Sequence, residues 1–100
     1  MLVDNHFEYG KLKGIIYDFQ DTGDILPRHV HDTDSVHISI IAKGSFKITG
    51  DNWEHTLNNG AVLDWEPGIY HEFQALEPNS RLINILKNYT PPQLLGNTVV

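Results

Sequence analysis

The sequence contains no cysteine and one methionine, and it has no long apolar run. The absence of cysteine excludes disulfide bonds, thiolate metal ligands and cysteine nucleophiles. No stretch approaches the roughly 20 apolar residues that a membrane-spanning helix needs. The first residues have neither the basic start nor the apolar centre of a secretory signal. We therefore expect a soluble cytoplasmic protein with no membrane partner.

Positive charge is also scarce, because 7 lysine and arginine residues stand against 13 aspartate and glutamate residues. The formal net charge of −6 argues against a nucleic-acid partner, which requires clustered lysine and arginine. A length of 100 residues, with 40% hydrophobic and 20% charged residues, is typical of one globular domain. We expect a single domain over residues 1–100, with residues 88–100 as a tail or an arm packed on a neighbour.

Helix signals are weak, whereas strand signals recur along the whole chain. Short alternating segments are separated by turns rich in glycine, proline, asparagine and aspartate, which predicts an all-β sandwich or barrel. Residues 1–13 are expected to form an arm or a first strand. The other expected strands are residues 14–20, 25–31, 36–42, 45–49, 53–57, 61–65, 69–75 and 81–86.

Histidines gather in one part of the sequence. His29, His31 and His37 are three of the six histidines, and His71 follows a later proline–glycine turn. Alternate residues of a strand share a face, about 6.6 Å apart, so the first two could share one ion. An antiparallel neighbouring strand would bring His37 opposite them. A single histidine in a strand is more often exposed or hydrogen-bonded than a ligand, and this spacing alone leaves both readings open.

Two segments around these histidines resemble the two sequence motifs of the cupin superfamily. In the first, five residues separate Gly23 from the His29-x-His31 pair, and six residues separate His37 from a second glycine. The second motif runs from Gly60 through a Pro-Gly turn to His71. Together the motifs span about half of the chain, in the order that the family has.

Three positions depart from the family pattern. His37 stands where most cupins have glutamate, after a gap that is slightly longer than usual. In the second motif, Glu66 replaces the motif proline, although Pro67 and Gly68 are kept. Ala75 replaces an asparagine that is common at the end of the second motif. The first departure changes the chemistry, since it makes the metal-ligand set all histidine.

The resemblance implies a double-stranded β-helix, or jelly roll, with one divalent transition metal per chain. Carried over by position, the ligands are His29, His31, His37 and His71. Imidazole ligands leave Fe, Ni, Zn, Mn, Co and Cu open as the metal. Four neutral imidazoles leave the full positive charge on the ion, so the site should be a stronger Lewis acid than one with a glutamate.

Strand alternation predicts which side chains surround this site. Ile41 is in phase with His37, Phe73 is in phase with His71, and Phe46 and Ile48 are expected to join them. These residues predict a mostly apolar pocket for a small-molecule ligand. His55 shares a strand face with two apolar residues, and it either lines this pocket or has a surface or packing role.

Two functions fit these features. The first is a small metal-dependent enzyme of dioxygenase, isomerase or lyase type that acts on a small polar organic or sugar-derived substrate. The second is a non-enzymatic small-molecule-binding or sensor protein with a structural metal, because one fold supports many functions. A homodimer is expected as well, because a small barrel has exposed sheet edges that the termini of a neighbour could cover.

Overall fold

The computed structural model describes residues 1–10, 12–29, 36–65 and 69–86. Within these ranges the protein is all-β, and no described helix could span a membrane. The described strands are β1 (Leu2–Tyr9), β2 (Leu12–Phe19), β3 (Ile25–His29), β4 (Val36–Lys43), β5 (Ser45–Thr49), β6 (Glu54–Asn58), β7 (Val62–Asp64), β8 (His71–Ala75) and β9 (Ser80–Leu86).

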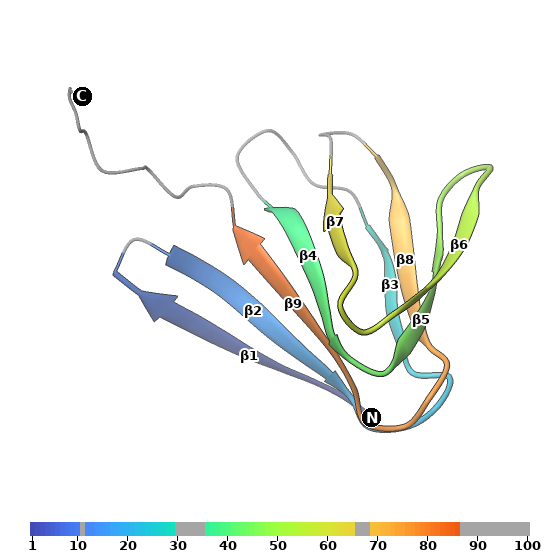
Figure 1. Cartoon of the computed structure of the whole chain (residues 1–100), viewed down its shortest axis with the longest axis horizontal. Coiled ribbons are helices and arrows are strands. Elements are labelled where there is room, and N and C mark those ends of the chain that lie inside the picture. Colours follow the sequence, from blue (N-terminus) through green and yellow to red (C-terminus); the bar gives the residue numbers. More distant parts are fainter. Residues whose placement is uncertain (11, 30–35, 66–68, 87–100) are drawn as a thin grey trace.

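The strands form two sheets that face each other as a jelly roll (Figure 1). One sheet has the order β1-β2-β9-β4-β7, and the other has the order β3-β8-β5-β6. The sheets are not closed into a barrel, and the β1–β2 hairpin extends away from the four-stranded sheet. β3 ends, β4 begins, β7 ends and β8 begins at the same end of the sandwich. That end therefore holds His29, the last residue of β3, and His71, the first residue of β8.

The predicted strands are confirmed, whereas one predicted pairing is wrong. β1 shows that the first residues form a strand and not a free arm, and β2 begins at Leu12, two residues earlier than expected. The expected pairing of residues 25–31 with residues 36–42 does not occur. β3 pairs with β8, while β4 pairs with β9 and β7 in the facing sheet. β3 and β4 thus belong to different sheets, and this long-range arrangement is not specified by the local hydrophobic pattern. The predicted tail, residues 88–100, lies outside the described residues.

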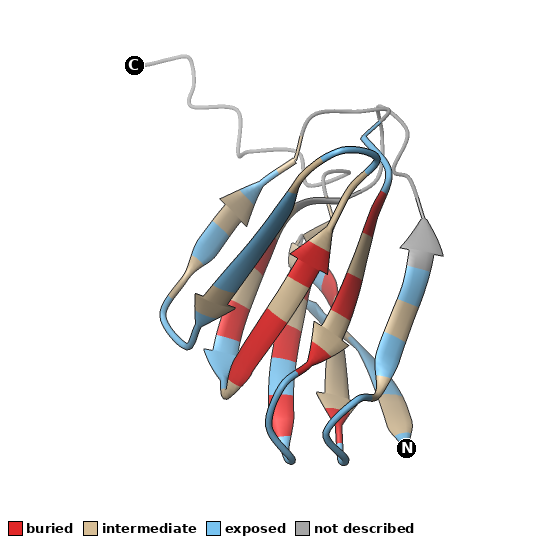
Figure 2. Ribbon diagram, turned by 90° about the vertical axis from the view of Figure 1, so that its right-hand side faces the viewer, coloured by how far each residue is buried: buried red, intermediate tan, exposed pale blue. Residues whose placement is uncertain are grey.

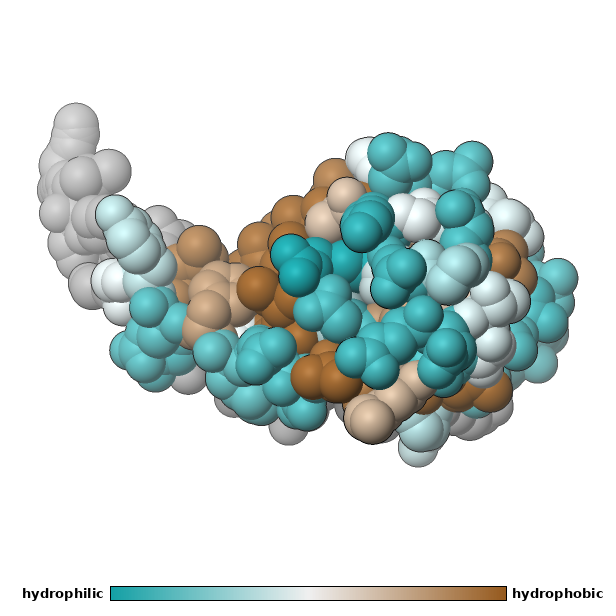
Figure 3. All heavy atoms as spheres, turned by 90° about the horizontal axis from the view of Figure 1, so that it is seen from below, coloured by the Kyte–Doolittle hydropathy of each residue, from teal (hydrophilic) through white to brown (hydrophobic). Residues whose placement is uncertain are grey.

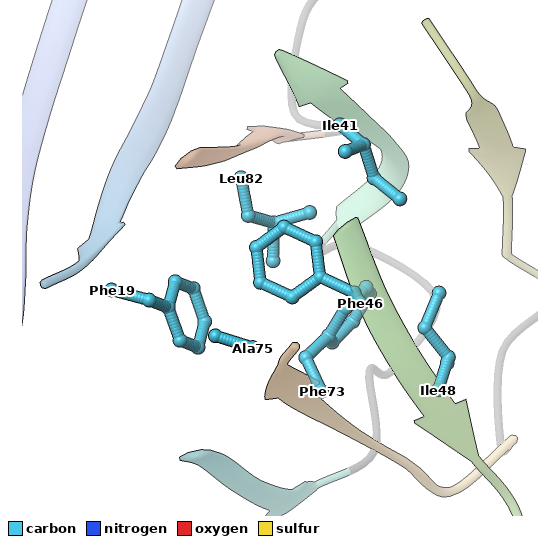
Figure 4. Close-up of a cluster of buried hydrophobic side chains, with 7 residues drawn as sticks. All are labelled: Phe19, Ile41, Phe46, Ile48, Phe73, Ala75 and Leu82. Atoms are coloured by element: carbon cyan, nitrogen blue, oxygen red, sulfur yellow. The ribbon is translucent and has the colours of Figure 1, made fainter. Parts of the chain in front are cut away.

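Buried residues alternate with less buried ones along the strands of the sandwich (Figure 2). This alternation follows from the two-residue period of a strand, which sends every second side chain inward. The resulting core is a cluster between the sheets (Figure 4), and it consists of Phe19, Ile41, Phe46, Ile48, Phe73, Ala75 and Leu82.

Three phenylalanine rings form the centre of this core. The ring of Phe46 lies 4.8 Å from that of Phe19 and 6.1 Å from that of Phe73, measured between centroids. Both pairs are edge-to-face, with interplanar angles of 76° and 87°, an arrangement that aromatic quadrupoles favour. Phe46 therefore links strands β2, β5 and β8 across the two sheets.

Gly44 allows the chain to cross from β4 in one sheet to β5 in the other. Its φ angle is +81°, a conformation that residues with a Cβ rarely adopt. A Cβ at this position would also lie 2.0 Å from Oγ of Ser80, so two constraints require glycine.

The outer face of the five-stranded sheet also has many apolar residues, beside the Asp18–Arg81 ion pair. Phe7 lies across Gly14, where a Cβ would be 2.4 Å from the phenyl ring, and so covers a gap in β2. Seen from below, apolar side chains reach the surface in a band through the middle of the molecule (Figure 3). The strand registers place eight apolar residues on the outer face of the five-stranded sheet: Phe7, Leu12, Ile16, Ile38, Ile40, Val62, Ile83 and Ile85.

Candidate functional site

His71 is the first residue of β8, and its side chain lies on the inward face of the sheet with 1% of its surface exposed. Its Nδ1 atom lies 3.0 Å from the carbonyl oxygen of Ile69. A carbonyl oxygen can only accept, so this is a hydrogen bond when Nδ1 holds the proton, and the neutral ring then has its lone pair on Nε2. Metal-binding histidines are commonly oriented in this way, so His71 fits the role of a ligand.

The fold places His29 beside His71. The two residues are direct backbone partners in the antiparallel ladder between β3 and β8, after a register shift that follows Leu26. For His29 the structure describes the backbone alone. The pairing nevertheless joins the first motif to the second, although many residues separate them in the sequence.

His37 comes from the opposite sheet. It lies in β4, where the register with β9 shifts between Val36 and Ile38, so one extra residue is accommodated there. The structure describes the backbone of His37, while His31 lies outside the described residues. Among the side chains that are described, no three histidine, aspartate or glutamate residues gather around one point. The four-histidine site therefore stays a prediction.

Trp65 is the closest described aromatic neighbour of His71. The two rings are stacked, with centroids 3.9 Å apart and planes inclined by 10°. The indole Nε1 donates a hydrogen bond to Oγ of Ser39 at 2.8 Å, and that hydroxyl donates to Oδ1 of Asn84 at 2.6 Å. Ser39 and Asn84 are buried partners on adjacent strands, so the five-stranded sheet holds the indole against the imidazole.

The sequence analysis did not identify Trp65 as part of the site. Trp65 lies six residues before His71 in the second motif. Strand alternation does not predict which side chains stack on each other across a turn, so this contact could not be inferred. Ser39 alternates with Ile41 along β4, and both residues are buried. Its role as the hydroxyl that links Trp65 to Asn84 depends on the pairing of β4 with β7 and β9, which join residues far apart in the sequence.

A cavity of about 210 Å³ lies next to Trp65, where β6 and β7 form corresponding edges of the two sheets. The centroids of Trp53 and Trp65 are 6.2 Å apart and those of Trp53 and His55 are 5.7 Å apart, so a row of rings leads from His71 to His55. His55 lines this cavity and is itself exposed, while its place in a pocket at the predicted metal site stays a prediction. The lining residues are Ile48, Trp53, His55, Leu57, Leu63 and Trp65.

The four residues expected to form an apolar pocket are all fully buried. Ile41, Phe46, Ile48 and Phe73 belong to the core cluster, and each is at most 1% exposed. Ile48 also lines the cavity beside Trp65. The cavity's other walls come from β6, from the end of β7 and from the residues that flank these strands.

A second hollow, of about 340 Å³, lies where β2 ends and β9 begins, at the opposite end of the sandwich from the start of β8. The guanidinium of Arg81 donates to both carboxylate oxygens of Asp18, at 2.7 and 3.2 Å. This hydrogen bonding raises the pKa of Arg81, the guanidinium being favoured in its charged form. Arg81 and Asp18 thus form an ion pair with each other at the protein surface. A surface ion pair of this kind contributes little to the free energy of unfolding.

Solved structures with the same strand arrangement were found, and their sequences are distant. KdgF from a Halomonas species aligns with a TM-score of 0.76 and 20% identity over 89% of this chain and 82% of its own. An RmlC-like cupin from Desulfovibrio desulfuricans aligns with a TM-score of 0.71 and 22% identity, over 86% and 82% of the two chains. This is the cupin fold.

A further structure with the cupin fold is a predicted oxalate decarboxylase from Thermotoga maritima. It aligns with a TM-score of 0.73 and 13% identity over 86% of this chain and 79% of its own. No family model matches the sequence, and no curated protein does. At these identities the comparisons establish the fold, while ligands and activity depend on the site of this chain.

Proposed function

We propose that the protein holds one divalent transition-metal ion through His29, His31, His37 and His71, and that it is a small metal-dependent enzyme. The observation that supports this most is the backbone pairing of His29 with His71, together with the buried, oriented imidazole of His71. β3 ends with His29 and β4 begins with Val36 and His37 at the end of the sandwich where β8 begins, which supports the proposal. An ion bound there would supply Lewis-acid chemistry.

The described residues favour particular roles in such a site. The carbonyl of Ile69 orients the imidazole of His71, and Trp65 shields one side of it from water. The reaction class that we propose is dioxygenase, isomerase or lyase chemistry on a small organic substrate. Structural neighbours include KdgF and a predicted oxalate decarboxylase, and these names are compatible with a small-molecule enzyme.

The test is elemental analysis of untagged protein that has been purified without nickel resin or chelator. We expect about one equivalent of a transition metal per chain, or uptake of about one equivalent after addition of Fe(II), Ni(II) or Zn(II) to chelator-treated protein. The uptake should follow a single-site isotherm. No metal in the purified protein and no uptake of any of the three ions would refute the proposal.

A second candidate is a small-molecule-binding or sensor protein in which the metal is structural. One observation favours it: none of the six described residues that line the cavity beside Trp65 is aspartate or glutamate, so the described lining supplies no carboxylate base. The absorption spectrum of the Co(II)-substituted protein separates the two candidates. A spectrum that changes when azide is added indicates an open coordination position, whereas an unchanged spectrum favours the structural role.

We also propose that the chain forms a homodimer through the outer face of the five-stranded sheet. This outer face has apolar residues on all five of its strands, and a second protein surface could cover them. A second copy presents the same surface, so two such faces are complementary in chemistry. This places the interface on a sheet face and not on the strand edges that the sequence suggested.

Sedimentation velocity tests the homodimer. The unmodified protein should sediment as a dimer, while Ile83→Glu and Val62→Glu should sediment as monomers because each places a charge in the apolar face. Gln74→Glu in β8 adds the same charge to the outer face of the other sheet, and this control should remain dimeric. A monomeric unmodified protein at 50–100 μM, taken as about the upper working range, would contradict the proposal.

A further inference from the structure

We propose that the cavity lined by Trp53 and Trp65 is a binding slot for an aromatic ring. The cavity of about 210 Å³ is somewhat larger than the roughly 150 Å³ cavity that holds benzene in a protein core. It can therefore take one ring with a small substituent. Because Trp65 also stacks on His71, the slot adjoins the proposed metal site, and its role in supplying that site with substrate rests on the proposed function.

The two indoles are placed to contact a flat ligand. Their centroids are 6.2 Å apart and their planes are inclined by 32°. A ring needs about 3.5–4.0 Å to each face that it contacts. A ring in contact with both indole faces would need about 7–8 Å between them, so a flat ligand stacks on one indole and meets the edge of the other.

The remaining lining favours an aromatic ring over a sugar. Ile48, Leu57 and Leu63 offer apolar surface, and His55 is the one polar side chain among the six described lining residues. A sugar ring would leave most of its hydroxyl groups without a protein partner in such a slot, which is costly when they are buried. The slot therefore narrows the substrate class from polar or sugar-derived compounds to compounds that carry an aromatic ring.

Both indoles are held in place before any ligand binds. A Cβ on Gly50 would lie 2.0 Å from Cε2 of Trp53, so the indole lies directly over this glycine in the turn between β5 and β6. The Gly50 amide also donates to the Trp53 carbonyl at 2.9 Å. Trp65 is held by its hydrogen bond to Ser39. Gly50 is thus a positioning residue, and a slot with fixed walls loses less entropy when it binds a ring.

The protein reports on the slot directly, since Trp53 and Trp65 are its two tryptophans. We would titrate metal-free protein with benzyl alcohol and follow intrinsic tryptophan emission, with calorimetry as a second readout. Cyclohexylmethanol and glucose serve as the non-aromatic and sugar probes. A saturable emission change with benzyl alcohol, at least about tenfold tighter than with either comparison probe, is the expected result.

Three variants assign the binding to the slot. Trp53→Ala and Gly50→Ala should each weaken benzyl alcohol binding about tenfold in calorimetry, because one removes a wall and the other displaces it. Thr56→Ala changes an exposed residue of β6, three residues after Trp53, and should bind as the unmodified protein does. Circular dichroism verifies that each variant is folded.

Binding that Trp53→Ala leaves unchanged would overturn the proposal, as would glucose or cyclohexylmethanol binding as tightly as benzyl alcohol. Absence of saturable benzyl alcohol binding to the unmodified protein would overturn it too. The titration uses metal-free protein, so its result is separate from that of the metal analysis. Protein that binds the probe but no metal would refute the proposed metal site and leave the slot standing.

Discussion

His71→Ala is expected to abolish metal binding, with an affinity loss of more than about 100-fold. Partners that merely orient a ligand already contribute 10–100-fold to metal affinity, as an order of magnitude, and a ligand that binds the ion directly contributes more. His71 has the required properties among the described residues, because it is buried, its Nδ1 faces a carbonyl, and its backbone is paired with that of His29. The measurement is calorimetric titration of chelator-treated protein with Zn(II).

The control for this variant is His6→Ala, which removes an imidazole from the exposed face of β1. It should bind the ion as tightly as the unmodified protein. His71→Ala also removes the ring that stacks on Trp65, so its thermal unfolding must be measured alongside to separate loss of the ligand from loss of the fold. A folded His71→Ala variant that keeps full affinity would exclude His71 from the ligand set.

Phe46→Ala should give the largest loss of stability, about 3–5 kcal/mol in the free energy of unfolding. The side chain is fully buried and contacts the rings of Phe19 and Phe73, so its removal leaves a cavity between the two sheets and breaks two edge-to-face contacts. Small domains are stable by about 5–15 kcal/mol, so a loss of this size could unfold a large share of the molecules. Urea unfolding followed by circular dichroism measures it.

Lys47→Ala is the matched control for Phe46→Ala, because the two residues are adjacent in β5 and point to opposite faces of the sheet. The control should change the free energy of unfolding by less than about 0.5 kcal/mol, as for most surface substitutions. A loss below about 1 kcal/mol for Phe46→Ala would mean that the core collapses around the gap. The three-ring contact would then not be the centre of the fold.

The strands could be predicted because their signals are local. Alternation of polar and apolar residues marks strands such as β5 and β8, and it also predicts the inward positions of Phe46, Ile48 and Phe73, whose burial agrees. The turn at Gly44 was marked by a residue type that tolerates a positive φ angle. Each of these features depends on a few neighbouring residues, so the sequence pattern contains the information.

The pairing of strands could not be predicted in the same way. A hairpin between residues 25–31 and 36–42 satisfies the local pattern, yet β3 and β4 lie in different sheets. The contact between Trp65 and His71 is another case. Trp65 follows β7 in one sheet and His71 begins β8 in the other, so their rings meet only when the two sheets pack. Such contacts depend on the burial of apolar surface by the whole domain.

By itself, the sequence determined the all-β class, the strands and the likeness to cupin motifs at the histidines, since these depend on residue type and spacing. The tertiary structure decided that His29 is paired with His71, that Trp65 covers the imidazole, and that Trp53 and Trp65 enclose a cavity. It also decided that the outer face of one sheet is apolar across five strands. The physical reason is that these features join residues far apart in the chain, which meet when the two sheets bury their shared core.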